Sequence, residues 1–69
     1  MRYAIVYFGR PDRIIRSMAT EHGARTVAQR AKGTGTCTAA RVYECETVAM
    51  ARTANISVIR EGERVVFEA

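Results

Sequence analysis

Residues 3–8 read Tyr-Ala-Ile-Val-Tyr-Phe, and Gly9-Arg10-Pro11-Asp12 follows them directly. Aromatic and β-branched residues favour an extended strand, whereas glycine, proline and aspartate favour a turn. The two segments therefore predict a first strand that ends at a tight turn. Residues 13–19 fit either a second strand that returns from this turn or a helix that begins at Asp12, because their apolar residues also suit helical spacing. The turn favours the strand.

One main helix is predicted over residues 21–33. Thr20 supplies an N-cap, Glu21 places an acid in the first turn, where it suits the helix dipole, and Gly33 ends the helix. The apolar side chains recur at i, i+3, i+4 and i+7, so they form one narrow stripe. Its small side chains would let the helix approach a sheet closely. The stripe consists of Ala24, Val27, Ala28 and Ala31.

The second half of the chain is predicted to be mostly strand. A strand begins near Ala40. Residues 47–54 fit either its continuation or a short helical connection, since their alanines favour the helix and their β-branched residues do not. Residues 56–67 match a hairpin with a two-residue Glu61-Gly62 turn. This hairpin would pair Arg60 with Glu63, Val58 with Val65, and Ile56 with Phe67.

Together these elements predict a single α+β domain over residues 1–69. We expect two layers, in which an antiparallel sheet of four or five strands carries one main α-helix packed on one face. A chain of about 60 residues buries only roughly 60% of the surface that its unfolded form exposes, so its stability should be marginal. A homodimer or another partner would then cover the apolar surface that remains.

The hydropathy pattern predicts a protein that does not enter a membrane. The longest apolar run, Ala4–Phe8, is far shorter than the roughly 20 residues that span a bilayer. The first residues lack the pattern of a secretory signal, so we expect a cytoplasmic protein. In that compartment Cys37 and Cys45 would be reduced thiols.

No pattern of catalytic or metal-binding residues is apparent. His22, Cys37 and Cys45 are the candidate soft ligands, and they lack the paired spacing of metal sites. The string Lys32-Gly33-Thr34-Gly35-Thr36 resembles a phosphate-binding loop, but its glycines follow a predicted helix instead of preceding one. We therefore predict a protein that is not an enzyme and holds no metal and no cofactor.

The basic residues are unevenly distributed along the chain. Residues 1–32 contain seven bases and two acids, a net charge of +5, whereas residues 33–69 contain four bases and five acids, a net charge of −1. Ten of the eleven bases are arginine, an excess that a GC-rich genome would also produce. A positive half attracts phosphates or acidic surfaces. The charge thus indicates an anionic partner.

The predicted helix turns its basic residues away from the alanine stripe. At about 100° per residue, Arg25, Gln29 and Lys32 lie opposite the stripe and Arg30 lies at its flank. No acid follows Glu21 on this helix, so we expect unpaired guanidinium groups that can grip a phosphate or carboxylate. A solvated polar face is the ordinary alternative. With three upstream arginines, the candidate partner-binding residues are Arg25, Gln29, Arg30, Lys32, Arg10, Arg13 and Arg16.

Several strings are similar to those of a known family. They are residues 3–8, the helix segment 24–30 and the segments 43–48 and 56–67. Together with the chain order, they resemble the small phage-encoded anti-CRISPR proteins, in particular type I-F inhibitors with one helix on a five-stranded sheet. The resemblance implies a non-enzymatic inhibitor that docks on an RNA-guided surveillance complex and blocks hybridisation of target DNA. The matching basic helix positions are Arg25 and Arg30.

Three functional hypotheses follow. The first is a phage- or mobile-element-encoded inhibitor that docks a basic helix face on a nucleoprotein with an acidic or phosphate surface. The second is a direct nucleic-acid binder whose affinity falls steeply with salt. Its strand aromatics would stack on bases, although aromatics on central strands more often belong to the core. The third is a homodimeric module.

Overall fold

The structure is a computed structural model that describes residues 1–9 and 12–69, except for the side chains of residues 14–17. The predicted turn at residues 9–12 thus lies partly outside the described residues. In chain order the elements are β1 (Arg2–Phe8), β2 (Arg13–Met18), α1 (Glu21–Gly33), β3 (Ala39–Cys45), α2 (Val48–Arg52), α3 (Ile56–Glu61) and β4 (Val65–Glu68).

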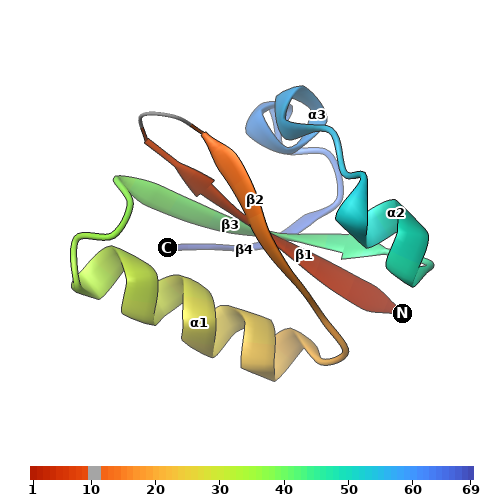
Figure 1. Cartoon of the computed structure of the whole chain (residues 1–69), viewed down its shortest axis with the longest axis horizontal. Helices are drawn as coiled ribbons and strands as arrows, with labels where there is room; N and C mark the ends of the chain where they lie inside the picture. Colours follow the sequence, from red (N-terminus) through yellow and green to blue (C-terminus); the bar gives the residue numbers. More distant parts are fainter. Residues whose placement is uncertain (10–11) are drawn as a thin grey trace.

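The strands form one antiparallel sheet in the order β2-β1-β3-β4 (Figure 1). β1 is central: Ile5 lies between Arg16 of β2 and Val42 of β3. The α+β class and the antiparallel sheet are confirmed. The segment after the first turn is a strand, as favoured, and its helical alternative is wrong.

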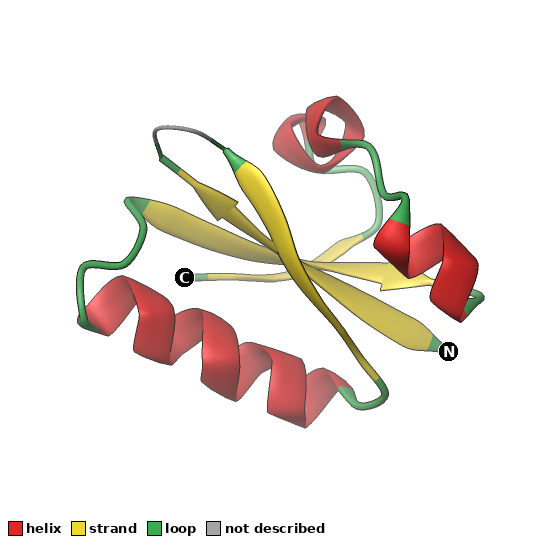
Figure 2. Ribbon diagram, viewed as in Figure 1, coloured by secondary structure: helices red, strands yellow, loops and turns green. Residues whose placement is uncertain are grey.

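The longest helix, α1, packs under one face of the sheet (Figure 2). Its N-cap is Thr20, whose Oγ1 accepts a hydrogen bond from the backbone N–H of Gly23 at 3.2 Å. Ala24, Ala28 and Ala31 are buried against β1 and β3, and Val27 is partly buried beside them. The predicted helix and its alanine stripe are confirmed.

The opposite face of the sheet is covered by α2 and α3, so the structure has a further layer that the sequence interpretation did not include (Figure 1). Thr47 caps α2 by accepting from the N–H of Met50 at 3.1 Å, which decides residues 47–54 in favour of a helix. Ala51 of α2 and Ile59 of α3 are fully buried. The single main helix of the prediction is therefore accompanied by two short ones.

The predicted hairpin over residues 56–67 is wrong. Asn55 Oδ1 accepts from the N–H of Ser57 at 2.8 Å and starts α3, which ends at Gly62 with a φ of 91°. A glycine in this left-handed conformation is a common helix C-cap. The alternating apolar residues looked like a strand, but Ile56 and Ile59, three residues apart, share the face that packs on the sheet.

Burial on both faces explains the uninterrupted apolar run of β1. Ile5 and Tyr7 pack toward α1, whereas Ala4, Val6 and Phe8 pack toward α2 and α3. A strand covered on both sides carries apolar residues at consecutive positions instead of alternating ones. Tyr7 and Phe8 are both buried and belong to the core, so they are not open for stacking, and Tyr3 is partly buried against the α1 cluster.

The two cysteines are free thiols and lie in different apolar clusters. Cys37 packs with the α1 cluster, and Cys45 packs with Ala4 and Ala51 on the other face. No group of potential metal ligands occurs among the described residues. Over the same residues, none of the helices has the length and hydropathy needed to cross a membrane.

Candidate docking surface

Arg25 is held by contacts within the protein. Its Nη2 lies 2.9 Å from a carboxylate oxygen of Glu21, four residues earlier on α1, and donates to the carbonyl of Val66 at 3.5 Å. Its guanidinium lies 5.2 Å from the centre of the Phe67 ring. The expectation that no acid pairs with an arginine of this helix is therefore wrong for Arg25. This side chain ties α1 to β4.

The last turns of α1 present a different kind of basic group. Gln29, Arg30 and Lys32 are exposed. In the part of the chain that the structure describes, no carboxylate lies within ion-pair distance of Arg30 or Lys32. Arg30 and Lys32 lie near the C-terminus of α1, where the negative end of the helix dipole stabilises cations. We call Gln29, Arg30 and Lys32 the α1 basic end.

The upstream arginines are described only in part. Arg13 is exposed at the start of β2. Arg10 lies outside the described residues, and Arg16 is described in its backbone alone. Their contribution to a docking surface stays a prediction.

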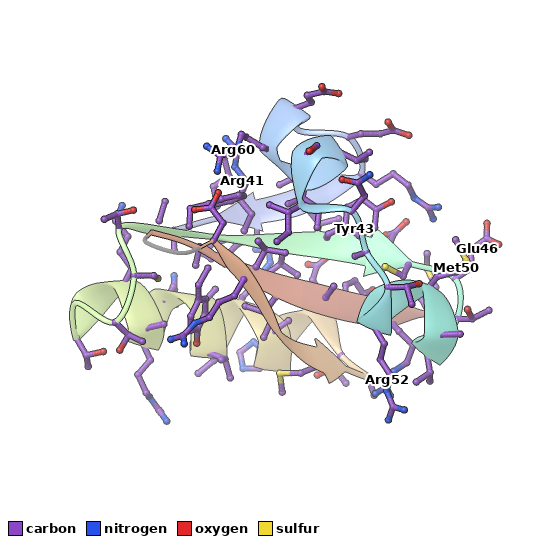
Figure 3. All side chains as sticks on the ribbon, turned by 45° about the horizontal axis from the view of Figure 1, so that its top comes forward. Arg41, Tyr43, Glu46, Met50, Arg52 and Arg60 are labelled. Atoms are coloured by element: carbon purple, nitrogen blue, oxygen red, sulfur yellow. The ribbon has the colours of Figure 1, made fainter. Side chains whose placement is uncertain are left out.

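A second group of arginines, which sequence reasoning did not single out, fastens α3 to the sheet. Arg41 Nη1 donates to the carbonyls of Ile59 and Arg60 at 2.8 and 2.6 Å, and its Nε lies 2.6 Å from Glu68. Arg60 pairs with Asp12. Both guanidinium groups lie over Phe8, at 5.5 and 5.1 Å from its ring centre. Figure 3 shows Arg41 and Arg60 together at one end of the sheet, far from Arg52 on α2.

We call Arg41 and Arg60 the α3 latch. In the last turn of α3, Arg41 supplies a donor to the carbonyl of Arg60, and the carbonyl of Ile59 accepts both from Arg41 and from the backbone N–H of Gly62 at 3.0 Å. The sequence carries no direct signal for this role, because it depends on α3 being a helix. Phe8, at the end of an uninterrupted apolar strand, was the available hint that a further layer covers the sheet.

The ion pairs found among the described residues neutralise equal numbers of bases and acids. Four arginines, Arg25, Arg41, Arg60 and Arg64, pair with Glu21, Glu68, Asp12 and Glu44. Removing four bases and four acids from eleven and seven leaves seven bases and three acids, so the net charge of +4 lies entirely outside these pairs. The three remaining acids are Glu46, Glu61 and Glu63, all exposed and all in the half of the chain after α1. The α1 basic end thus belongs to the half of the sequence that has the positive net charge.

The three candidate soft ligands lie in different settings. His22 is exposed in the first turn of α1, and Cys37 and Cys45 are buried in separate clusters. No protein-family model, curated protein or solved structure gives a match to this chain.

Proposed function

We propose that this chain is a small non-enzymatic binding protein, encoded by a phage or mobile element, that acts in the host cytoplasm. It docks the α1 basic end on a nucleoprotein such as a CRISPR surveillance complex and blocks access of nucleic acid. The observation that carries the proposal is the exposure of Arg30 and Lys32 with no carboxylate partner among the described residues.

Physical chemistry favours an anionic partner at this position. The planar guanidinium of Arg30 can donate two parallel hydrogen bonds to one phosphate or carboxylate. Exposed cations with no internal ion-pair partner attract phosphates and carboxylates over a distance of about 8–10 Å at physiological salt. The alanine stripe fixes the helix on the sheet, so these side chains are presented from a rigid support.

The role of Arg25 in this proposal differs from that of its neighbours. Because Arg25 is engaged by Glu21 and by β4, it positions α1 and contributes little free charge to docking. Arg30 and Lys32 carry the contact, with exposed Arg13 as a second basic position. The upstream Arg10 and Arg16 belong to the same proposed surface.

The test uses two charge reversals that alter the net charge equally. Arg30→Glu changes the last turn of α1, and Arg52→Glu changes the last turn of α2 on the opposite face. A purified type I surveillance complex with its guide RNA is incubated with each protein, and binding of labelled target DNA is measured by gel shift. We expect the wild type and Arg52→Glu to block DNA binding and Arg30→Glu to lose the block. Equal behaviour of the two variants, or no block by the wild type, contradicts the proposal.

Direct binding of nucleic acid is the alternative, supported by the same basic groups. Neutralising several phosphates makes the logarithm of the affinity fall linearly with the logarithm of salt concentration. A titration of the protein alone with duplex and single-stranded DNA at two salt concentrations separates the two functions. Tight, salt-sensitive binding without any complex present favours the alternative. Light scattering tests the homodimer in the same samples.

A further inference from the structure

The two edges of the sheet differ in what covers them. At the β4 edge, Ala40 and Ala69 exchange both backbone hydrogen bonds, at 3.3 and 2.8 Å. Hydrogen-bonding direction alternates from residue to residue along an antiparallel pair, so the backbone groups of Val42 and Phe67 also point toward each other. The backbone groups of Val66 then point outward. Arg25 donates to this outward carbonyl. The β4 edge is therefore only four residues long and partly occupied by a side chain of α1.

At the β2 edge, no bond of this kind engages the outward backbone among the described residues, although α2 lies beside the strand. The N–H of Glu44 donates to the carbonyl of Arg64, so the backbone N–H and C=O groups of even-numbered residues in β3 point toward β4. Those of odd-numbered residues therefore point toward β1. In the register of β1 with its two neighbours, the backbone N–H and C=O groups of Ile5 and Tyr3 then point toward β2, where they pair with Arg16 and Met18. The backbone groups of Ser17, which lies between those two residues of β2, therefore point outward. Among the described residues, the ladder to β1 is the only set of hydrogen bonds that engages the backbone of β2.

The length and setting of β2 suit a further strand. It spans six residues, a usual length for a natural strand, and one bulge opposite Ile5 and Val6 is its only irregularity. α2 packs on the sheet face at Ala4 and Cys45. The outward N–H and C=O groups of an edge strand can pair with an extended chain.

The charge near β2 selects among strands. Residues 13–20 contain Arg13 and Arg16 and no acid. The acid just before them, Asp12, is engaged by Arg60 and by the N–H of Gly9 at 2.9 Å. A second copy of the chain would bring further arginines beside these, and like charges on neighbouring strands are unfavourable. An acidic strand would instead be attracted.

We propose that β2 is an acceptor edge for an extended, acidic segment of a partner protein. Main-chain hydrogen bonds to the outward groups of β2 would provide the affinity, and the positive charge of residues 13–20 would provide the preference for carboxylates. A nucleic acid lacks the alternating N–H and C=O groups that this edge pairs with, so the partner at this edge is a polypeptide. The β2 edge shares Arg13 and Arg16 with the proposed nucleoprotein surface but does not include Arg30 and Lys32, so the Arg30→Glu variant distinguishes a failure of one proposal from a failure of the other.

The test removes one outward hydrogen bond from β2 while keeping the ladder to β1. Ser17→Pro deletes an N–H that faces outward, a position where an edge strand tolerates proline, and Ser17→Ala is the matched control that keeps the N–H. The probe is a labelled peptide of about eight residues that alternates glutamate and valine, a usual strand length. Binding is followed by fluorescence anisotropy and by backbone NMR shifts.

We expect the wild type and Ser17→Ala to bind the peptide, with shifts confined to β2 and its neighbours, and Ser17→Pro to bind about tenfold more weakly, as loss of a hydrogen bond in this setting implies. A lysine–valine peptide should not bind. Since Ser17→Pro could also disturb folding, a second arm uses the unmodified protein with a glutamate–valine peptide methylated on alternate backbone nitrogens, which should bind equally weakly. Arg30→Glu should leave peptide affinity unchanged.

Three results would overturn the inference. They are the absence of peptide binding by the wild type, equal binding of the methylated and unmethylated peptides, and a dimer in light scattering that Ser17→Pro converts to monomer. The last result would assign the β2 edge to a second copy of the chain.

Discussion

The helices on the two faces of the sheet are attached in different ways. On one face, the 13-residue helix α1 is fastened by buried alanines, and its last basic residues point to solvent. On the other face, the five- and six-residue helices α2 and α3 bury one residue each, and two arginines complete the attachment of α3. Helices shorter than about 12 residues are marginal by themselves, so they depend on such tertiary contacts. The long helix α1 leaves Arg30 and Lys32 exposed at its end, whereas α3 depends on Arg41 and Arg60 for its attachment.

The largest expected effect concerns the single buried anchor of α3. Ile59→Ala removes a side chain with no exposed surface and leaves a cavity beside Val6 and Phe8. We expect a loss of about 2–5 kcal/mol in the free energy of unfolding, measured by urea denaturation. The matched change on the other face, Val27→Ala, affects a partly buried residue and should cost less. Equal losses would contradict the difference between the faces.

The second-largest effect is expected for the replacement of Arg41 in the α3 latch. Arg41→Met keeps much of the apolar side chain but leaves the carbonyl of Arg60 and the carboxylate of Glu68 without the Arg41 donor, while the carbonyl of Ile59 keeps only its bond from Gly62. Because the site is partly exposed, we expect a loss of about 1–3 kcal/mol. The same change at Arg30 should stay within about 0.5 kcal/mol. Urea denaturation of both variants sharpens the comparison, and a loss at Arg30 as large as that at Arg41 would break it.

The N-cap of α1 should have a smaller effect. Thr20→Ala removes the hydroxyl that accepts from Gly23, and such a loss costs about 1 kcal/mol. Thr26→Ala is the control, since its exposed hydroxyl only bonds back to the carbonyl of His22. Thermal melts followed by circular dichroism measure both. An unchanged melting temperature for Thr20→Ala would show that packing of the alanine stripe alone determines the stability of α1.

The smallest effect is a pH dependence at the α2 face. Burial raises the pKa of the Cys45 thiol above its ordinary value of 9.0, with the nearby Arg64 acting in the opposite direction. As the pH rises above 9.0, the unfolded chain loses this proton more readily than the folded one, so the free energy of unfolding falls. Denaturation at a series of alkaline pH values should show a steeper decline for the wild type than for Cys45→Ala. Parallel declines would show that the thiol does not contribute.

The sequence predicted those elements whose local signals agree with one another. For α1, the cap at Thr20 and the alanine spacing indicate the same helix, and for β1 the composition and the following turn indicate the same strand. The prediction failed at residues 56–61 because the apolar residues there fit both the alternation of a strand and the spacing of a helix. Packing of Ile59 and the bonds from Arg41 decide for the helix, and both come from strands distant in the sequence.

The sequence predicted which basic residues α1 carries, but not which of them are engaged within the protein and which are exposed. Periodicity placed Arg25 and Lys32 on one helix face, and it could not show that β4 lies close enough to engage Arg25. The Glu21–Arg25 pair was readable from the i,i+4 spacing alone. The latch of Arg41 and Arg60 was not readable, since it joins three segments through Phe8.

The most direct measurement of the difference between the two faces is the salt concentration at which matched variants elute from immobilised heparin, a general polyanion. Arg30→Glu and Arg52→Glu each lower the net charge from +4 to +2 and each alter an exposed residue in a last helical turn. If the α1 basic end is the docking surface, Arg30→Glu elutes at clearly lower salt than Arg52→Glu, while their melting temperatures agree. Elution of both variants at the same salt would contradict the account.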